Sequence, residues 1–70
     1  STQDVAALVV HVVGVEAPVH VDDLARRLAG AIGWQRVTDR LRAGLRRGIS
    51  LAAARGQVEV RGDFLWRPGE

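Results

Sequence analysis

The length and composition of the chain already exclude several classes of protein. Its 70 residues, with 47% hydrophobic and 26% charged side chains, describe one globular domain, because a domain typically takes about 150 residues. The absence of cysteine excludes disulfides and thiolate metal sites, and two histidines alone cannot fill a zinc coordination sphere, so we expect no metal and no other cofactor. Without a charged leader or an apolar run of about 18 residues, we expect neither a signal peptide nor a membrane span, and a cytoplasmic location.

The positive charge is concentrated in one segment. All ten basic residues are arginines, and the formal net charge at pH 7 is +2. Residues 1–35 carry a net charge of −2 and residues 56–70 carry −1, whereas residues 36–55 hold six arginines against a single aspartate, which gives +5. We therefore expect any polyanionic partner to meet residues 36–55.

Residues 1–14 are predicted to form a helix. Valine and leucine recur at spacings of three and four over residues 5–13, which is the pattern of one apolar helix face. Ser1 and Thr2 are the candidate N-caps, and Gly14 is the expected C-terminal stop. Because valine is a weak helix former, a strand is the alternative for this segment.

The chain then turns at residues 16–18 and continues as a very short strand and a second helix. Residues 19–21 alternate apolar, polar and apolar, which is typical of a strand. Asp22 is the expected N-cap of the second helix, and Gly30 or Gly33 is its expected end. The side chains on the inward face of this helix are predicted to be Leu24, Ala25, Leu28 and Ile32.

A third helix is predicted over residues 36–55, after the turn Gly33-Trp34-Gln35, with Gly56 closing it. Gly44 and Gly48 lie inside this helix, and each disfavours it by about 1 kcal/mol relative to alanine. We therefore expect a bend or a looser second half. The inward stripe, with apolar residues at spacings of four and three, consists of Val37, Leu41, Leu45, Ile49 and Ala52.

The C-terminal segment is predicted to form a hairpin. Residues 57–60 alternate strictly in polarity, and residues 64–66 follow a turn at Arg61-Gly62-Asp63. A two-residue loop would separate the aromatic side chains of the second strand from the valines of the first. A three-residue loop would gather Val58, Val60, Phe64 and Trp66 on one face, so the burial of apolar surface favours the three-residue loop. We therefore predict that Phe64 and Trp66 lie in the core.

The order helix, short strand, helix, turn, helix and hairpin predicts an α+β fold, mainly α, of the winged-helix type. Four short motifs lie within roughly residues 5–69: Glu16-Ala17-Pro18-Val19-His20, Arg26-Arg27, Gly33-Trp34-Gln35-Arg36 and Gly62-Asp63-Phe64-Leu65-Trp66-Arg67-Pro68. In these motifs the chain resembles a short domain-of-unknown-function family found at the C-terminal end of large bacterial superfamily-one helicase or ATPase-like proteins. The resemblance implies a single winged-helix-like domain over residues 1–70, excised from a larger helicase-like protein and without an assigned activity.

The candidate binding residues are arginines of the third helix. On a helical wheel of residues 36–55, three arginines point away from the apolar stripe: Arg36, Arg40 and Arg47. Arg42 and Arg46 flank the same surface. In helix-turn-helix proteins the second helix of the pair enters the major groove, where arginine contacts phosphates or guanine. The sequence therefore predicts an accessory module that binds nucleic acid weakly, duplex DNA above all. The alternative is a protein–protein or interdomain module that docks on a parent helicase or ATPase without touching nucleic acid.

Other polar or aromatic residues have simpler interpretations. Trp34 could stack on a base, but a tryptophan between two helices is more often part of the core or its rim. Adjacent Asp22 and Asp23 do not face one another on a helix, and we expect His11 and His20 to be satisfied locally. Because no nucleophile, base and orienting group converge, we expect neither an enzyme nor a small-molecule substrate.

Overall fold

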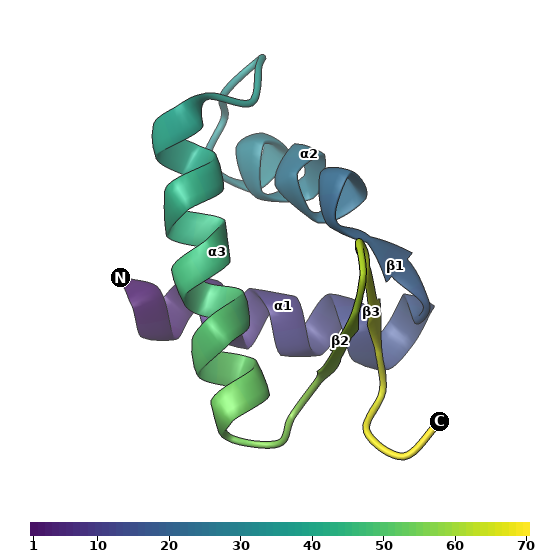
Figure 1. Ribbon diagram of the computed structural model, residues 1–70. Helices are drawn as coiled ribbons and strands as arrows, with labels where there is room; N and C mark the ends of the chain where they lie inside the picture. Colours follow the sequence, from purple (N-terminus) through teal and green to yellow (C-terminus); the bar gives the residue numbers. More distant parts are fainter.

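Three helices and a small antiparallel sheet make up the fold in the computed structural model, which describes residues 1–70 (Figure 1). The mainly helical α+β class is confirmed, and the arrangement is compatible with a winged-helix-like fold in which β2 and β3 form the wing. No helix has both the length and the apolar character needed to cross a membrane. In chain order the elements are α1 (Thr2–Glu16), β1 (Val19–His20), α2 (Val21–Ala31), α3 (Asp39–Ala54), β2 (Glu59–Arg61) and β3 (Phe64–Trp66).

The first segment is a helix, as its apolar spacing predicts, and it is longer than expected. The Ser1 side chain accepts a hydrogen bond from the backbone N–H of Asp4 at 3.2 Å, so Ser1 is the N-cap. Gly14 does not stop the helix, which continues to Glu16. Tertiary packing outweighs the weak helix propensity of valine here, because three valines of α1 are fully or almost fully buried.

The second helix begins two residues earlier than the sequence suggests. The His20 side chain accepts a hydrogen bond from the backbone N–H of Asp22 at 3.0 Å, so His20 and not Asp22 is the N-cap of α2. The prediction that His20 is satisfied locally is confirmed. At the other end the chain reverses at Gly33, whose φ of 78° suits glycine.

The third helix begins later than predicted, at Asp39. The Thr38 side chain accepts a hydrogen bond from the backbone N–H of Leu41 at 3.1 Å, and Thr38 itself is extended, with φ −105° and ψ 164°. Arg36 and Val37 precede this cap, so the prediction that both belong to the helix is wrong. Val37 nevertheless packs against the core from the loop. Gly56, with φ 71°, closes the chain behind the helix as expected.

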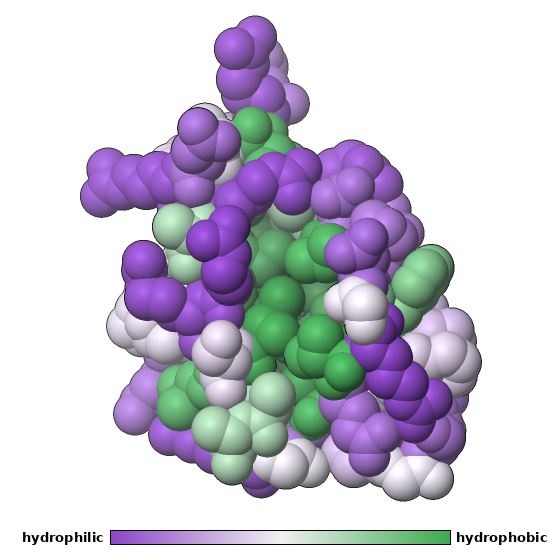
Figure 2. Space-filling view, in the orientation of Figure 1, coloured by the Kyte–Doolittle hydropathy of each residue, from purple (hydrophilic) through white to green (hydrophobic).

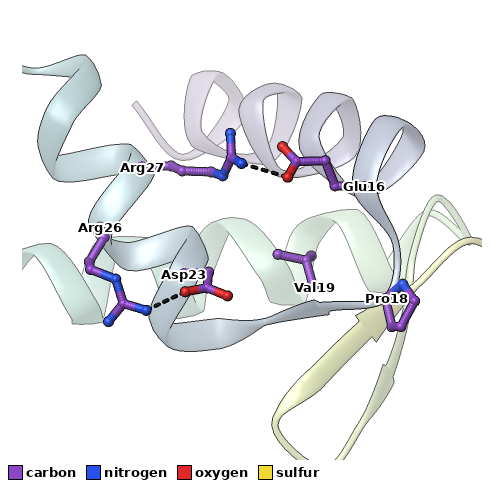
Figure 3. Close-up of a pocket in the computed structure, with 6 residues that line it drawn as sticks. All are labelled: Glu16, Pro18, Val19, Asp23, Arg26 and Arg27. Carbon is purple, nitrogen blue, oxygen red and sulfur yellow. Dashed lines mark hydrogen bonds and ion pairs between the residues drawn. The ribbon is translucent and has the colours of Figure 1, made fainter.

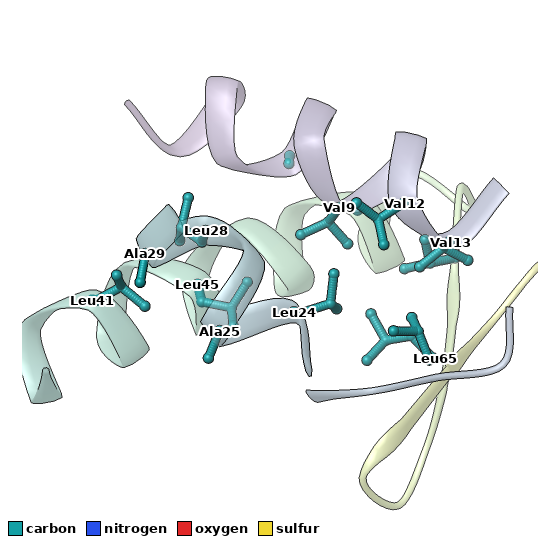
Figure 4. Packing of buried hydrophobic residues seen from close by; sticks show 14 residues of the cluster. Val9, Val12, Val13, Leu24, Ala25, Leu28, Ala29, Leu41, Leu45 and Leu65 are labelled. Atoms are coloured by element: carbon teal, nitrogen blue, oxygen red, sulfur yellow. The ribbon is translucent and has the colours of Figure 1, made fainter. Parts of the chain in front are cut away.

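The core lies where α1, α2 and α3 meet the inner face of the sheet (Figure 4). Gly48 is buried in it, and α1 crosses α3 at this residue. A Cβ atom at position 48 would lie 2.4 Å from Val5 Cγ1 and 3.1 Å from the backbone nitrogen of Ala6. Gly48 is therefore a point of close helix contact and not the loosened position that its helix propensity suggested. The core consists of Ala6, Val9, Val12, Val13, Val19, Leu24, Ala25, Leu28, Ala29, Leu41, Leu45, Ala52, Val58 and Leu65.

The hairpin has a two-residue loop, so the predicted three-residue loop is wrong. The sheet order is β1-β3-β2, and Val60 pairs with Leu65 while Arg61 pairs with Phe64. Leu65 is 1% exposed, Phe64 is 43% exposed and Trp66 is only half-buried, so the two aromatic side chains are not core residues.

Two physical features favour this register. Gly62 has φ 59° in the first position of the loop, which is the glycine position of a type II′ turn. In addition β3 is the central strand, since Val19 of β1 pairs with Leu65 from its other side. The inward residue of β3 is therefore Leu65, which the prediction from residues 57–66 alone placed on the outward face because it did not include pairing with β1.

Candidate nucleic-acid interface

Arginines inside and outside residues 36–55 differ in their ion pairs. Five of the ten arginines pair with a carboxylate: Arg26 with Asp23, Arg27 with Glu16, Arg42 with Asp22, Arg61 with Glu59, and Arg67 with Glu70. The remaining five form no ion pair, and every one of them lies in residues 36–55. These unpaired arginines are Arg36, Arg40, Arg46, Arg47 and Arg55.

The pocket between the end of α1 and the start of α2 illustrates the paired arginines (Figure 3). Arg27 reaches across to Glu16, and Arg26 bonds to Asp23 one turn earlier in its own helix. Both guanidinium groups are occupied by carboxylates that line the same pocket. This pocket therefore offers no excess positive charge to an anionic ligand.

Three unpaired arginines project from the exposed side of α3. Arg40 and Arg47 are seven residues apart, so they lie almost in line on one side of the helix, and Arg46 lies nearer the hairpin. All three are exposed, as the sequence predicts. Ala43, which is half-buried between Arg40 and Arg46, and Ser50, which is exposed beyond Arg47, are small residues of the same helix.

Arg42 is placed differently from the other arginines of α3. Its Nη1 donates a 3.0 Å hydrogen bond to Oδ1 of Asp22, in the first turn of α2. This bond, assisted by the charges of Arg42, His20 and Arg26, holds the pKa of Asp22 below its ordinary value. Arg42 therefore links α2 and α3, and its positive charge is compensated by the Asp22 carboxylate.

The Asp22 carboxyl should lose this pKa depression when Arg42 is removed. In Arg42→Gln we expect the pKa of Asp22, followed by carbon NMR of its carboxyl, to rise toward 3.8, its ordinary value. Because the folded-state pKa is lowered, the pair contributes stability above the ordinary pKa, and the contribution is lost as pH falls through the folded-state pKa. Arg46→Gln is the matched control and should leave the Asp22 titration unchanged. Identical Asp22 curves in wild type and Arg42→Gln would contradict the ion pair.

Two unpaired arginines lie outside α3, and the arginines of the hairpin segment are paired. Arg36 lies in the loop between α2 and α3, exposed and next to a cleft that Trp34 also lines. Arg55, which the helical wheel did not single out, is the C-cap of α3. In the hairpin, Arg61 bonds to Glu59 and lies 4.7 Å from the centroid of the Trp66 ring, so the wing does not offer a free cation there.

A groove runs between α3 and the hairpin, next to the exposed side of α3 that carries Arg40, Arg46 and Arg47. Figure 2 shows a band of hydrophobic atoms there, bordered by hydrophilic side chains. Val60 on its rim is 49% exposed. The apolar lining consists of Val21, Leu45, Ile49, Val60 and Leu65, and Arg42, Arg46 and Asp63 are the charged residues at its edge.

The fold defines a small, mainly helical α+β domain with a helix-turn-helix pair and a hairpin. Residues 1–43 match the model of a family described as protein of unknown function, DUF3320, and the chain belongs to that family. The match covers α1, β1, α2 and the first turn of α3. Comparisons with curated proteins and with solved structures gave no match.

Proposed function

We propose that this domain is a non-catalytic accessory module that binds nucleic acid, with duplex DNA as the favoured ligand, through the arginines of α3. The observation that carries the proposal is the distribution of ion pairs. Every arginine outside residues 36–55 has a carboxylate partner, and five of the six inside have none. A phosphate backbone supplies the anions that these guanidinium groups lack, and binding it releases counterions.

The position of α3 supports the same function. It is the second helix of the α2–α3 pair, which is the helix that enters the major groove in helix-turn-helix proteins. Arg40, Arg46 and Arg47 are exposed on it, and Arg36 in the preceding loop is close enough in sequence to add a contact. The resemblance to domains of helicase or ATPase-like proteins supports a role beside a nucleic-acid motor in the cytoplasm.

The proposed contact is weak. Residues 56–70 carry a net charge of −1, and both arginines of this segment are paired with carboxylates, so the hairpin adds little to the grip. With three or four phosphate contacts we expect a dissociation constant on the order of 10⁻⁴ to 10⁻⁵ M at physiological salt.

Replacing Arg40, Arg46 and Arg47 together with glutamine should abolish DNA binding and leave the fold intact, because all three are exposed. In wild type, three phosphate contacts give a slope of about −2.7 in a plot of log affinity against log salt concentration. The measurement is a duplex titration at several salt concentrations, followed by backbone amide shifts. The matched control replaces Arg27, Arg61 and Arg67, which removes the same charge from paired positions and should weaken binding far less. Equal losses in the two triple variants would reduce the effect to net charge and contradict the proposed face.

A second candidate function is docking on a protein, favoured by the apolar groove between α3 and the hairpin. Exposed Val60 and half-buried Ile49 line it, and their burial would contribute a hydrophobic term that DNA binding does not use. If duplex DNA at millimolar concentration shifts no amide of α3, docking becomes the better explanation of this face.

A further inference from the structure

We propose that Trp34 is a stacking site for an unpaired nucleobase, so that the domain binds a junction between duplex and single strand more tightly than a blunt duplex. This inference rests on the proposed function. It assigns an unpaired base as the ligand of the loop between α2 and α3. The α3 arginines alone would recognise only the phosphate backbone.

Trp34 does not serve the core. It is 44% exposed and is not among the hydrophobic residues that pack against the core cluster. The backbone that carries it is nevertheless held in place, because the N–H of Trp34 donates a 2.8 Å hydrogen bond to the carbonyl of Ala29. The N–H of Gly33 also bonds to the carbonyl of Gly30, at 3.1 Å. Ligand binding at an exposed indole on an ordered backbone does not require the loop to be ordered first, which lowers its entropic cost.

The two tryptophans of the chain differ in what covers them. The guanidinium of Arg61 lies 4.7 Å from the centroid of the Trp66 ring, and Trp66 is half-buried. Trp34 has no such cation and no aromatic neighbour. Its ring is therefore the one tryptophan surface that remains available for a planar ligand.

The cleft beside Trp34 favours a nucleotide over a protein side chain. Three arginines line it, Arg26, Arg36 and Arg42, and no carboxylate does. Arg26 and Arg42 are paired with Asp23 and Asp22, so Arg36 is the arginine of this cleft that has no ion pair. An indole beside an unpaired guanidinium group is a combination that binds single-stranded nucleic acid, in which a base stacks on the ring and the arginine holds the backbone. The Gln35 amide, which also lines the cleft, can hydrogen-bond to a base edge.

The loop is placed to meet a strand that leaves a duplex. Figure 1 shows it projecting beyond the neighbouring ends of α2 and α3. Arg36 follows Trp34 by two residues, and Arg40 lies in the first turn of α3. Arg36 lines the same cleft as Trp34, so a strand held at Arg36 lies beside the indole, where a base that has lost its partner can stack.

The test uses Trp66→Phe as the background, so that Trp34 is the only tryptophan that fluoresces. Three probes are compared at low salt: a blunt duplex, the same duplex with a short single-stranded overhang, and the duplex with an abasic overhang of equal charge. We expect the overhang with bases to bind about tenfold more tightly than the other two probes and to quench the Trp34 fluorescence. Trp34→Ala should remove this preference and leave the blunt-duplex affinity within about twofold, and Trp34→Phe should retain part of the preference.

Each other outcome overturns a defined part of the argument. Equal affinity for the three probes, with binding that still depends on Arg40, Arg46 and Arg47, overturns the stacking site and leaves the proposed function standing. A preference shared by the abasic overhang assigns the gain to charge alone and also overturns the stacking site. Failure of all three probes to bind overturns the proposed function itself.

Discussion

Replacing Gly48 with alanine is expected to destabilise the domain by about 2 kcal/mol or more, although alanine is the better helix former by about 1 kcal/mol. The added Cβ atom would lie 2.4 Å from Val5 Cγ1 and 2.9 Å from Val5 Cβ. The backbone nitrogen of Ala6 is 3.1 Å away, so a rotation of the Val5 side chain cannot relieve the overlap completely. The α1 and α3 helices must move apart, and core contacts are lost with them.

Gly44 provides the matched control because it lies four residues earlier in the same helix. A Cβ atom there would meet only the Nη2 of Arg47, at 3.7 Å, which is an ordinary contact. We therefore expect Gly44→Ala to stabilise the domain by up to about 1 kcal/mol. Thermal melts followed by circular dichroism measure the stability change of both variants, since 1 kcal/mol shifts the melting midpoint by about 4–8 °C in a domain of this size. If the two variants melted alike, the close contact at Gly48 would be contradicted.

A second large effect is expected at Leu65, and none of comparable size at its neighbour Phe64. Leu65 is the inward residue of the central strand, opposite both Val19 and Val60, and is almost fully buried. Truncation to alanine leaves a cavity beside the core, so Leu65→Ala should cost about 3 kcal/mol. Phe64 is exposed, and its aromatic contact is an edge-on one with His20, at 5.1 Å between ring centroids. Phe64→Ala should therefore cost about 1 kcal/mol or less.

Urea denaturation of the two variants distinguishes the two hairpin registers. In the observed register the leucine variant loses far more stability than the phenylalanine variant. If wild type is itself only about 3 kcal/mol stable, Leu65→Ala is unfolded in water while Phe64→Ala still folds. The opposite ranking would indicate the three-residue loop, in which Phe64 faces the core and Leu65 faces outward.

The ion pairs show which of the arginines in residues 36–55 carry charge that is free to bind a ligand. The sequence places six arginines in residues 36–55, but one of them, Arg42, is held by Asp22. That pair joins residues 20 positions apart, and the pair of Arg27 with Glu16 joins residues 11 positions apart. Only the folded chain distinguishes these arginines from Arg40 and Arg47, which remain unpaired.

Several features of the fold follow from local sequence. The spacing of valines and leucines in α1 specifies a helix because side chains three and four apart share one face, and burial of that face outweighs β-branching. Ser1 was correctly included among the N-cap candidates, and Gly56 was correctly predicted to close α3. The basic character of residues 36–55 is likewise a property of composition, which folding redistributes but does not create.

Local hydrogen bonds at His20 and Thr38, which apolar periodicity does not predict, fix where α2 and α3 begin. The Thr38 cap places Arg36 before α3 and off the helix face predicted for it. Tertiary structure decided the rest. The role of Gly48 depends on Val5, which is distant in sequence and lies in another helix. Local periodicity determines which side chains share a face of one element. Register, close approach and ion pairing depend on a second element, whose position is set by the packing of the whole core.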